Sequence, residues 1–231
     1  MGKETGNYAK RKKRKALIVA NGQISDYNLT YRRVKKDYGF GENIIIVAAD
    51  GGIKHCMNMH IFPDIVMGDM DSINIKLMEK LGKNTKEIKF INSSTEKDES
   101  DTQLALDYVI EQQISEVIIL GALGDRIDHC LANIVLLASP SYRDKDIKII
   151  DEKNEITVIN KSMEINGEMG KKISIFSLSP YTYFVSTIGL QYKLKDEKLI
   201  FSPVRGLSNI FTADRASIKI KKGQLLIVKE L

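Results

Sequence analysis

The sequence of 231 residues contains no tryptophan, two cysteines and four prolines. Cys56 and Cys130 have no CxxC spacing, which argues against a disulfide scaffold or a zinc site and predicts two buried free thiols. There is no run of about 18 apolar residues that could span a membrane, and the N-terminus lacks the apolar stretch of a secretory signal. These absences predict a soluble, cytoplasmic protein with no membrane partner.

Positive charge is concentrated at the N-terminus. Residues 1–15 carry seven Lys and Arg against one Glu, whereas the remaining chain carries 28 basic and 29 acidic residues. Such a block is typical of a solvated, disordered tail, which can bind RNA, a membrane surface or nothing. We expect no basic face with interleaved aromatics in the rest of the chain, so nucleic acid is not the expected partner.

Residues 16–150 alternate between short β-branched runs and segments of helical period. Continuous apolar runs of this length are typical of strands buried on both faces of a parallel sheet. Apolar residues at helical spacing between Thr102 and Ile110 predict an amphipathic helix, and the almost wholly apolar segment 129–138 predicts a buried helix. The sequence therefore predicts an open, mostly parallel α/β sheet domain over residues 16–150. The expected strands are residues 16–20, 44–49, 65–67, 88–91, 117–120 and 147–150.

After Asp151 the pattern changes to short runs, several of them alternating, that are separated by Gly, Asn and Asp. This pattern predicts a small antiparallel β-sandwich domain over residues 151–231, with Lys222 and Gly223 forming a hairpin turn. So small a sandwich has exposed edges, and we expect it to dock on the first domain or on a second subunit.

Polar residues and glycines follow each of the first five expected strands directly. They are Asn21-Gly22, Asp50-Gly51-Gly52, residues 68–72, residues 92–101 and residues 121–129. In open α/β sheets the ligand crevice lies outside the carboxyl ends of the strands, so these loops are expected to meet at one edge. The charged residues that they bring there are Asp50, Asp69, Asp71, Lys97, Asp98, Asp101, Asp125, Arg126 and Asp128.

Asp69 and Asp71 indicate a metal site. Residues two apart in an extended segment point the same way, so the two carboxylates would repel each other unless a cation lay between them. Hard oxygen ligands beside a phosphate favour Mg²⁺.

The other charged residues could have purely structural roles. Asp98 and Asp101 could cap the following helix. The segment from Asp125 to His129 could form a surface salt bridge, although it lies between a buried strand and an expected buried helix. His55 and His60 are expected at the surface.

Several familiar catalytic motifs are missing from the sequence. It has no P-loop, no GxGxxG, no GxSxG and no HExxH. What remains is a rim rich in acids and glycines, with Lys97 and Arg126 as its cations. Carboxylates suit Mg²⁺, glycines let backbone N–H groups approach a ligand, and the cations suit phosphate oxygens. This combination indicates phosphoryl or pyrophosphoryl transfer from a nucleotide.

Five ordered motifs carry a resemblance to a known family. They are ADGG (49–52), PDIVMGDMDS (63–72), EKDESDT (96–102), GDRIDHCLAN (124–133) and GLSN (206–209). In order and spacing the chain resembles the bacterial thiamine pyrophosphokinases over roughly residues 16–229. The basic tail lies outside the resemblance.

The resemblance implies an ATP-binding α/β domain, a thiamine-binding β-sandwich domain and a homodimer with its sites at the interface. The implied reaction is thiamine + ATP → thiamine diphosphate + AMP, with ATP as co-substrate and Mg²⁺ as cofactor. The implied metal ligands are Asp69, Asp71, Asp98 and Asp101, and the implied catalytic residues are Asp71, Asp98, Asp101 and Arg126. ATP would be bound by Asp50, Gly51, Lys97, Asp125, Arg126, Asp128 and His129, and thiamine by Ser208 and Asn209 of the other subunit.

The sequence departs from the family in one feature, and two alternative functions remain open. Some family members stack an indole on thiamine, and without a tryptophan this role would pass to Tyr181, Tyr183 or Phe211. The same carboxylates could serve a Mg²⁺-dependent phosphohydrolase that uses water as its nucleophile. The basic tail could instead belong to a non-catalytic nucleic-acid binder.

Overall fold

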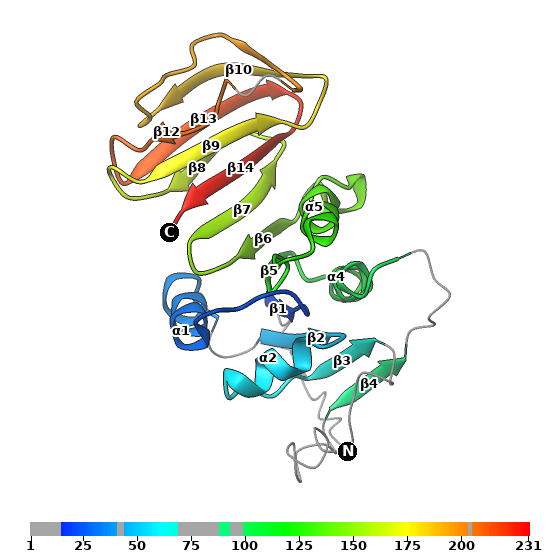
Figure 1. Ribbon diagram of the computed structural model, residues 1–231. Coiled ribbons are helices and arrows are strands. Elements are labelled where there is room, and N and C mark those ends of the chain that lie inside the picture. Colours follow the sequence, from blue (N-terminus) through cyan, green and yellow to red (C-terminus); the bar gives the residue numbers. More distant parts are fainter. Residues whose placement is uncertain (1–14, 41–43, 69–87, 93–98, 203–204) are drawn as a thin grey trace, which may run out of the picture.

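The structure is a computed structural model that describes residues 15–40, 44–68, 88–92, 99–202 and 205–231 (Figure 1). The strands of these ranges form two sheets, which we call the long sheet and the short sheet. The long sheet has the order β12-β9-β14-β7-β6-β5-β1-β2-β3-β4, and the short sheet has the order β11-β10-β13-β8. No helix in the described ranges is long and apolar enough to cross a membrane.

Six strands of the long sheet run parallel and confirm the expected α/β half. Each lies within one residue of its predicted run at either end. They are β1 (Lys15–Val19), β2 (Ile44–Ala49), β3 (Ile65–Gly68), β4 (Lys89–Asn92), β5 (Glu116–Leu120) and β6 (Asp146–Ile150). The inner strands β1, β3 and β5 are buried on both faces, as expected of apolar β-branched runs, whereas the edge strand β4 is partly exposed.

Helices cover both faces of this parallel half. Alternate residues of β1 separate the two cores: Ala16 and Ile18 pack on the side of α4 and α5, and Leu17 and Val19 pack on the side of α1 and α2. The helices are α1 (Tyr27–Asp37), α2 (Gly52–Asn58), α4 (Asp101–Glu111) and α5 (Ile127–Leu136), and a 3-10 turn spans Pro140–Tyr142.

The two helices predicted from apolar residues differ in outcome. Helix α4 buries Thr102, Ala105, Leu106 and Val109, as its amphipathic stripe predicts. The prediction that α5 is buried is wrong, because its apolar residues surround the helix and only one side meets the sheet. Ile127, Leu131 and Val135 recur every fourth residue and are 76%, 59% and 54% exposed. Helix α5 therefore presents an apolar stripe on its outer side.

The antiparallel half forms a two-layered sandwich around its own core, which contains Phe211, Ile175 and Ile218. In the long sheet it contributes β7 (Asn154–Ile159), β9 (Lys172–Ser177), β12 (Asn209–Ile210) and β14 (Leu225–Glu230). The short sheet consists of β8 (Met163–Asn166), β10 (Tyr181–Ile188), β11 (Lys198–Ile200) and β13 (Arg215–Lys222).

The long sheet continues through the change from α/β to sandwich. Strand β7 pairs antiparallel with β6, with Lys148 opposite Thr157. The tight connection between them is held by Asp151, whose Oδ1 accepts hydrogen bonds of 2.6 Å from the N–H groups of Lys153 and Asn154. One layer of the sandwich is thus an extension of the parallel sheet (Figure 1).

The predicted hairpin at Lys222 and Gly223 is wrong. Strand β13 pairs with β10 and β8, whereas β14 pairs with β7 and β9. The turn therefore carries the chain from the short sheet to the long one. Its residue types are those of a hairpin turn, since Gly223 has a φ of 111°, and only the long-range pairing distinguishes the two outcomes.

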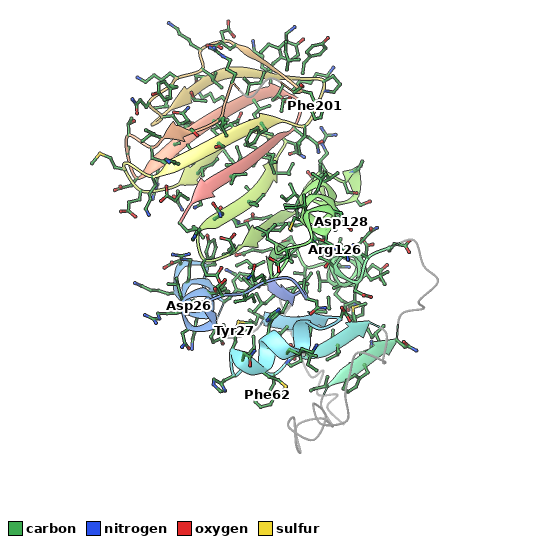
Figure 2. All side chains as sticks on the ribbon, in the orientation of Figure 1. Asp26, Tyr27, Phe62, Arg126, Asp128 and Phe201 are labelled. Atoms are coloured by element: carbon green, nitrogen blue, oxygen red, sulfur yellow. The ribbon has the colours of Figure 1, made fainter. Side chains whose placement is uncertain are left out.

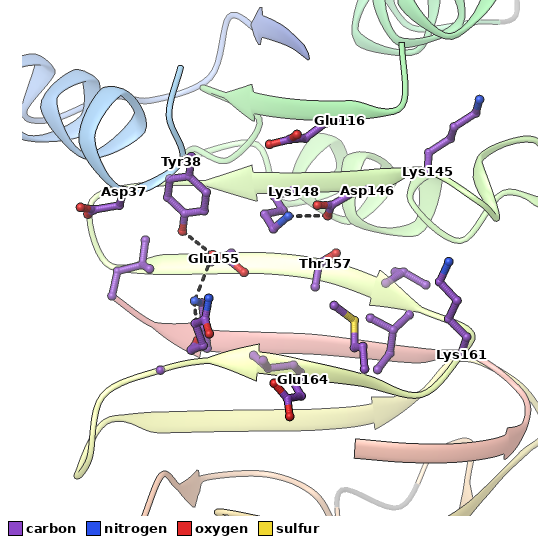
Figure 3. A pocket seen from close by; sticks show the side chains of 18 of the residues that line it. Asp37, Tyr38, Glu116, Lys145, Asp146, Lys148, Glu155, Thr157, Lys161 and Glu164 are labelled. Atoms are coloured by element: carbon purple, nitrogen blue, oxygen red, sulfur yellow. Dashed lines mark hydrogen bonds and ion pairs between the residues drawn. The ribbon is translucent and has the colours of Figure 1, made fainter. Parts of the chain in front are cut away.

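A buried ion pair ties α1 to both sheets and lines a cavity of about 940 Å³ (Figure 3). The hydroxyl of Tyr38 donates a hydrogen bond to the Glu155 carboxylate. Lys229 Nζ lies 3.1 Å from the same carboxylate and donates to the Asn166 carbonyl at 2.8 Å. Because Glu155 and Lys229 are 5% and 9% exposed, removal of either partner would leave a buried unpaired charge.

We predict that Tyr38→Phe lowers the free energy of unfolding at pH 8 by about 2 kcal/mol, because a hydrogen bond to a charged group is lost. Burial and the charge of Glu155 raise the pKa of Tyr38 above its ordinary value. The stabilisation is therefore complete below about pH 10, where an exposed tyrosine begins to ionise, and is lost as the pH rises further. Urea unfolding should show that wild type and variant differ less in their free energy of unfolding above pH 10 than at pH 8.

The exposed Tyr192 provides the control for this measurement. Tyr192→Phe should change the free energy of unfolding little at either pH. A gap between wild type and Tyr38→Phe that does not change with pH would contradict the assignment.

Candidate functional site

A cavity of about 920 Å³ lies at the carboxyl edge of the parallel strands. The chain runs outward in one direction from β1 to β4, then returns to place β5 and β6 on the other side of β1. Ligands bind at such a switch in strand order, since the loops on either side diverge there. The loops after β1 and β5 (residues 20–24 and 121–126), together with residues 49–50, 99–102 and the start of α5, line this cavity.

Six of the predicted site residues lie on the wall of this one cavity: Asp50, Asp101, Asp125, Arg126, Asp128 and His129. Figure 2 shows Arg126 and Asp128 at the start of α5. Gly51 lies behind Asp50, buried under the side chain of Asn21. Asp69, Asp71, Lys97 and Asp98 lie outside the described residues. Ser208 and Asn209 do not line the cavity and lie at the edge of the sandwich.

The turn after β2 holds Asp50 in a left-handed conformation with φ of 50°. Asn21 Nδ2 donates a hydrogen bond of 2.8 Å to Asp50 Oδ2. A Cβ on Gly51 would lie 2.1 Å from Asn21 Oδ1, and one on Gly52 would lie 1.9 Å from the Val19 carbonyl oxygen. The two glycines therefore let β1 and its loop pass directly over the turn that orients the Asp50 carboxylate.

Strand β3 ends beside the same aspartate. Gly68 has a φ of 150°, and a Cβ there would lie 3.0 Å from the Cα of Asp50. The N–H of Asp50 donates to the Met67 carbonyl at 2.7 Å. The end of β3 therefore lies next to Asp50.

Backbone hydrogen bonds join the loops after β1 and β5. The N–H of Gly22 donates to the Gly121 carbonyl and that of Gln23 to the Leu123 carbonyl, each at 2.6 Å. A Cβ on Gly22 would lie 2.3 Å from the Leu123 oxygen. Glycine at this position allows the two loops to form one continuous wall of the cavity.

His55 was expected at the surface, and that prediction is wrong. It is half-buried and lines the cavity, whereas His60 is exposed as expected. Its Nε2 lies 2.8 Å from the Gly22 carbonyl oxygen, which can only accept, so Nε2 carries a proton. In the neutral ring Nδ1 then accepts from the Tyr27 hydroxyl at 3.0 Å. Helices α1 and α2 thus hold the loop after β1 through His55.

Arg126 and Asp128 form a two-pronged ion pair at the mouth of the cavity. Arg126 Nε and Nη2 donate to the two Asp128 carboxylate oxygens at 2.9 and 2.6 Å. These hydrogen bonds hold the pKa of the Asp128 carboxyl well below its usual range. Both side chains remain largely exposed, so the guanidinium stays accessible to a ligand. The prediction that this segment could form a surface salt bridge is therefore confirmed for Arg126 and Asp128. Arg126 also brings a positive charge to the cavity wall.

The two cysteines differ in burial. Cys56 is fully buried, which raises the pKa of its thiol to about 12, as expected of an inert core thiol. Cys130 is only half-buried and lines the cavity, so the prediction of a buried thiol is wrong for it. Its Sγ bonds both the N–H and the carbonyl of Gly124, and so fixes the loop after β5 to α5.

Among the described residues, no group of three or more His, Cys, Asp or Glu side chains is placed to hold a metal ion. Asp50 and Asp101 do bring carboxylates to the cavity wall. Three of the four predicted metal ligands, Asp69, Asp71 and Asp98, lie outside the described residues. Hard oxygen donors of this kind fit Mg²⁺.

Asn209, predicted to bind thiamine, makes all its described hydrogen bonds within the sandwich. Its Oδ1 accepts from the N–H of Tyr192 and its Nδ2 donates to the Tyr192 carbonyl, each at 2.9 Å. Asn209 is buried, whereas Tyr192 is 60% exposed. The asparagine therefore holds the backbone of Tyr192 so that its ring faces outward.

Tyr192 is an aromatic residue that sequence reasoning missed. Of the three rings considered, Phe211 is fully buried in the sandwich core and cannot stack on a ligand. Tyr181 and Tyr183 lie on β10, in a different sheet from Asn209. No sequence signal marks Tyr192, because its link to Asn209 spans 17 residues and forms only in the fold.

We predict that His55→Ala destabilises the loop after β1, because the Gly22 carbonyl loses its hydrogen-bond donor. The free energy of local opening of this loop should fall by about 1 kcal/mol. Hydrogen exchange at the amides of Gly22 and Gln23 should become several-fold faster. Tyr27→Phe keeps the bond to Gly22 and should have a smaller effect. His60→Asn, at an exposed position whose φ of 55° asparagine tolerates, is the control. Unchanged exchange in His55→Ala would refute this role.

Comparison with known proteins agrees with the geometry. Residues 40–150 match the family model "Thiamin pyrophosphokinase, catalytic domain", and residues 155–225 match "Thiamin pyrophosphokinase, vitamin B1 binding domain". The thiamine pyrophosphokinase of Bacillus subtilis is 27% identical over 190 residues, which cover 81% of this chain and 88% of that protein. Thiamin pyrophosphokinase 1 of Caenorhabditis elegans is 25% identical over 75% of this chain and 74% of that protein.

Solved structures share the whole architecture. The crystal structure of the Bacillus subtilis thiamine pyrophosphokinase superposes with a TM-score of 0.81 at 26% identity, covering 94% of this chain and 98% of that one. The yeast thiamin pyrophosphokinase structure has a TM-score of 0.72 at 17% identity, covering 94% of this chain and 86% of that one, and so shares the fold. The two family models together span both halves of the long sheet, and the chain belongs to the thiamine pyrophosphokinase family.

Proposed function

We propose that this protein transfers a pyrophosphoryl group from ATP to the hydroxyl of thiamine, giving thiamine diphosphate and AMP. The observation that carries the proposal is the cavity at the switch in strand order, which gathers carboxylates, an arginine and glycine-lined backbone in a chain of this family. The hydroxyl oxygen attacks the β-phosphorus and the bond from that phosphorus to the α–β bridging oxygen breaks. AMP leaves, and the hydroxyl proton passes to a carboxylate of the cavity.

ATP would lie along the loops after β1 and β5. Arg126, with its planar fork, suits phosphate oxygens and can exchange Asp128 for them, because both side chains are exposed. Gly22, Gly121 and Gly124 let the backbones of these two loops approach each other closely and so form the wall along which ATP would lie. We assign Asp50, Gly51, Asp125, Asp128 and His129 to the support of this subsite, and Lys97 to charge neutralisation on the transferred group.

Asp69 and Asp71, with Asp98 and Asp101, would hold Mg²⁺ against the triphosphate. Their chemistry fits, since Mg²⁺ takes carboxylate oxygens together with phosphate oxygens. When bound, the ion would neutralise charge on the phosphate oxygens. Asp50, with the end of β3 directly beside it, supports a carboxylate cluster at this point of the edge.

Two features support a homodimer in which each site is shared. Ser208, Asn209 and Tyr192 lie in the sandwich and do not line the cavity of their own chain. The apolar stripe on α5, next to the cavity, is exposed in a single chain and would be covered by a second copy. We propose that the partner subunit brings its Tyr192 ring and Ser208 to thiamine, and that Asn209 acts by holding Tyr192. A cytoplasmic location stays a prediction.

The direct test is incubation with ATP, Mg²⁺ and thiamine, followed by identification of the products. We expect AMP and thiamine diphosphate, formed only when thiamine is present. Asp71→Asn should lower turnover at least a hundredfold, about 3 kcal/mol of transition-state stabilisation, with an unchanged melting temperature. Asp214→Asn, at an exposed position in the sandwich, is the control. Release of inorganic phosphate without thiamine would identify a phosphohydrolase instead.

Co-expression of two impaired variants tests the shared site. Asp71→Asn damages the α/β half and Tyr192→Ala the sandwich half, so each homodimer should be nearly inactive. A mixed dimer contains one site without either change, so a random mixture should recover about a quarter of wild-type activity. Adding Leu131→Asp to both chains should abolish the recovery and yield monomers in light scattering. Met169→Asp, a change of the same kind at another exposed apolar residue, should not. No recovery in a verified mixed dimer would show that each chain completes its own site.

A further inference from the structure

The outer face of the short sheet carries side chains that the proposed reaction does not use. Register places Tyr183 of β10 between Lys198 of β11 and Lys222 of β13. Beyond the register shifts that lie between Tyr183 and Ser186, Ser186 is paired with Lys219 on one side and bridged to Lys195 on the other. Directly opposed residues of antiparallel strands point to the same face, so these four lysines flank β10 on one face.

Burial identifies this face as the outer one. Thr182 and Thr187 of β10 are buried, as are their register partners Leu199 and Ile218. Tyr181 and Tyr183 are 48% and 39% exposed, and all four lysines are exposed. In Figure 1 strand β10 lies at the end of the sandwich farthest from the α/β half.

The two tyrosines form a small aromatic platform. Their ring centroids are 6.4 Å apart. Lys198 Nζ lies 4.4 Å from the centroid of Tyr181, a cation–π contact that keeps its ammonium group beside the rings. The exposed Ile200 lies opposite Tyr181 and extends the apolar area. Cations and flat rings thus alternate across three neighbouring strands.

The positive charge of this face is not neutralised locally. Among the described residues, no carboxylate lies within ion-pair distance of Lys195, Lys198, Lys219 or Lys222. Asp196, next to Lys195, is instead 3.9 Å from Lys221. The four ammonium groups are therefore available to an external anion.

We propose that this lysine–tyrosine face, made of Tyr181, Tyr183, Lys195, Lys198, Lys219 and Lys222, binds single-stranded RNA. A sheet face with exposed aromatics on an inner strand can stack unpaired bases, and flanking lysines can contact the phosphates. A second copy of the chain fits poorly, because face-to-face pairing would bring lysines against lysines. The inference is independent of the proposed enzymatic function.

This face contradicts the expectation that the chain has no basic surface with interleaved aromatics outside its tail. The expectation relied on a near-zero net charge and on the order of residues along the chain. The lysines come from two separate segments, residues 195–198 and 219–222, which meet on either side of β10 only through strand register. Lys198 and Lys219 each adjoin a buried apolar residue, Leu199 and Ile218, and the order of residues alone does not show that the two segments flank the same strand.

Fluorescence anisotropy with a labelled single-stranded uridine RNA of about 20 nucleotides tests the proposal. We expect Lys198→Glu/Lys222→Glu to weaken binding at least tenfold and to reduce the slope of log affinity against log salt. Lys35→Glu/Lys36→Glu on α1 makes the same change in net charge at exposed positions and should weaken binding less than threefold. Tyr181→Ala/Tyr183→Ala should weaken binding without changing net charge.

Further measurements distinguish RNA binding by this face from binding by the N-terminal tail, from misfolding of the variant and from general attraction to anions. A chain lacking residues 2–14 should still bind RNA and remain sensitive to the Lys198/Lys222 change. The Lys198→Glu/Lys222→Glu variant should keep its melting temperature and its rate of AMP formation. The proposal is overturned if RNA binding disappears with the tail, if the α1 control loses as much affinity as the face variant, or if duplex RNA binds as tightly. Tighter binding to vesicles containing phosphatidylserine than to RNA would also overturn it.

Discussion

Parallel pairing of β1 with both β2 and β5 is the constraint on which the rest of the structure depends. Lys15 is level with Ile44 on one side and with Glu116 on the other, so the three strands end at the same height. Backbone hydrogen bonds set this alignment, and it brings the following loops to one edge whatever their sequence separation. The cavity and its charged residues follow from that edge.

Close approach of backbone segments then decides which residues can stand at the edge. Gly22, Gly51 and Gly52 have no room for a Cβ, because the loop after β1 crosses the loops after β2 and β5. The same crossing brings Asn21 to Asp50 and His55 to Gly22. The polar groups of the cavity are therefore oriented by neighbours on other loops, which is the usual way that a site gains precise geometry.

The continuous long sheet also explains why the cavity and the residues proposed to bind thiamine lie far apart within one chain. It carries the α/β half and one layer of the sandwich in a single hydrogen-bonded array, reinforced by the buried pair of Glu155 and Lys229. Such an array holds Tyr192 and Asn209 at its β12 end, away from the cavity at β1 and β5. We propose that a second chain brings the two together and covers the exposed apolar stripe of α5.

Much of this protein can be predicted from its sequence. Local composition determined the six parallel strands, the amphipathic helix α4, the change of pattern after Asp151 and the set of charged residues that follow the strands. These features depend on side-chain period and turn chemistry, which act over a few residues. The motifs of the family, such as ADGG and GLSN, lie in the same local segments.

Only the tertiary structure decided the remaining features. They are the exposure of the apolar stripe of α5, the position of His55 in the cavity wall, and the turn at Gly223 that connects two sheets where a hairpin was expected. The lysines of two separate segments that lie beside Tyr183 are a further example. Each of these depends on which distant segments become neighbours. Strand pairing and packing of the whole chain determine which distant segments become neighbours. The spacing of apolar residues within one segment carries no information about these contacts.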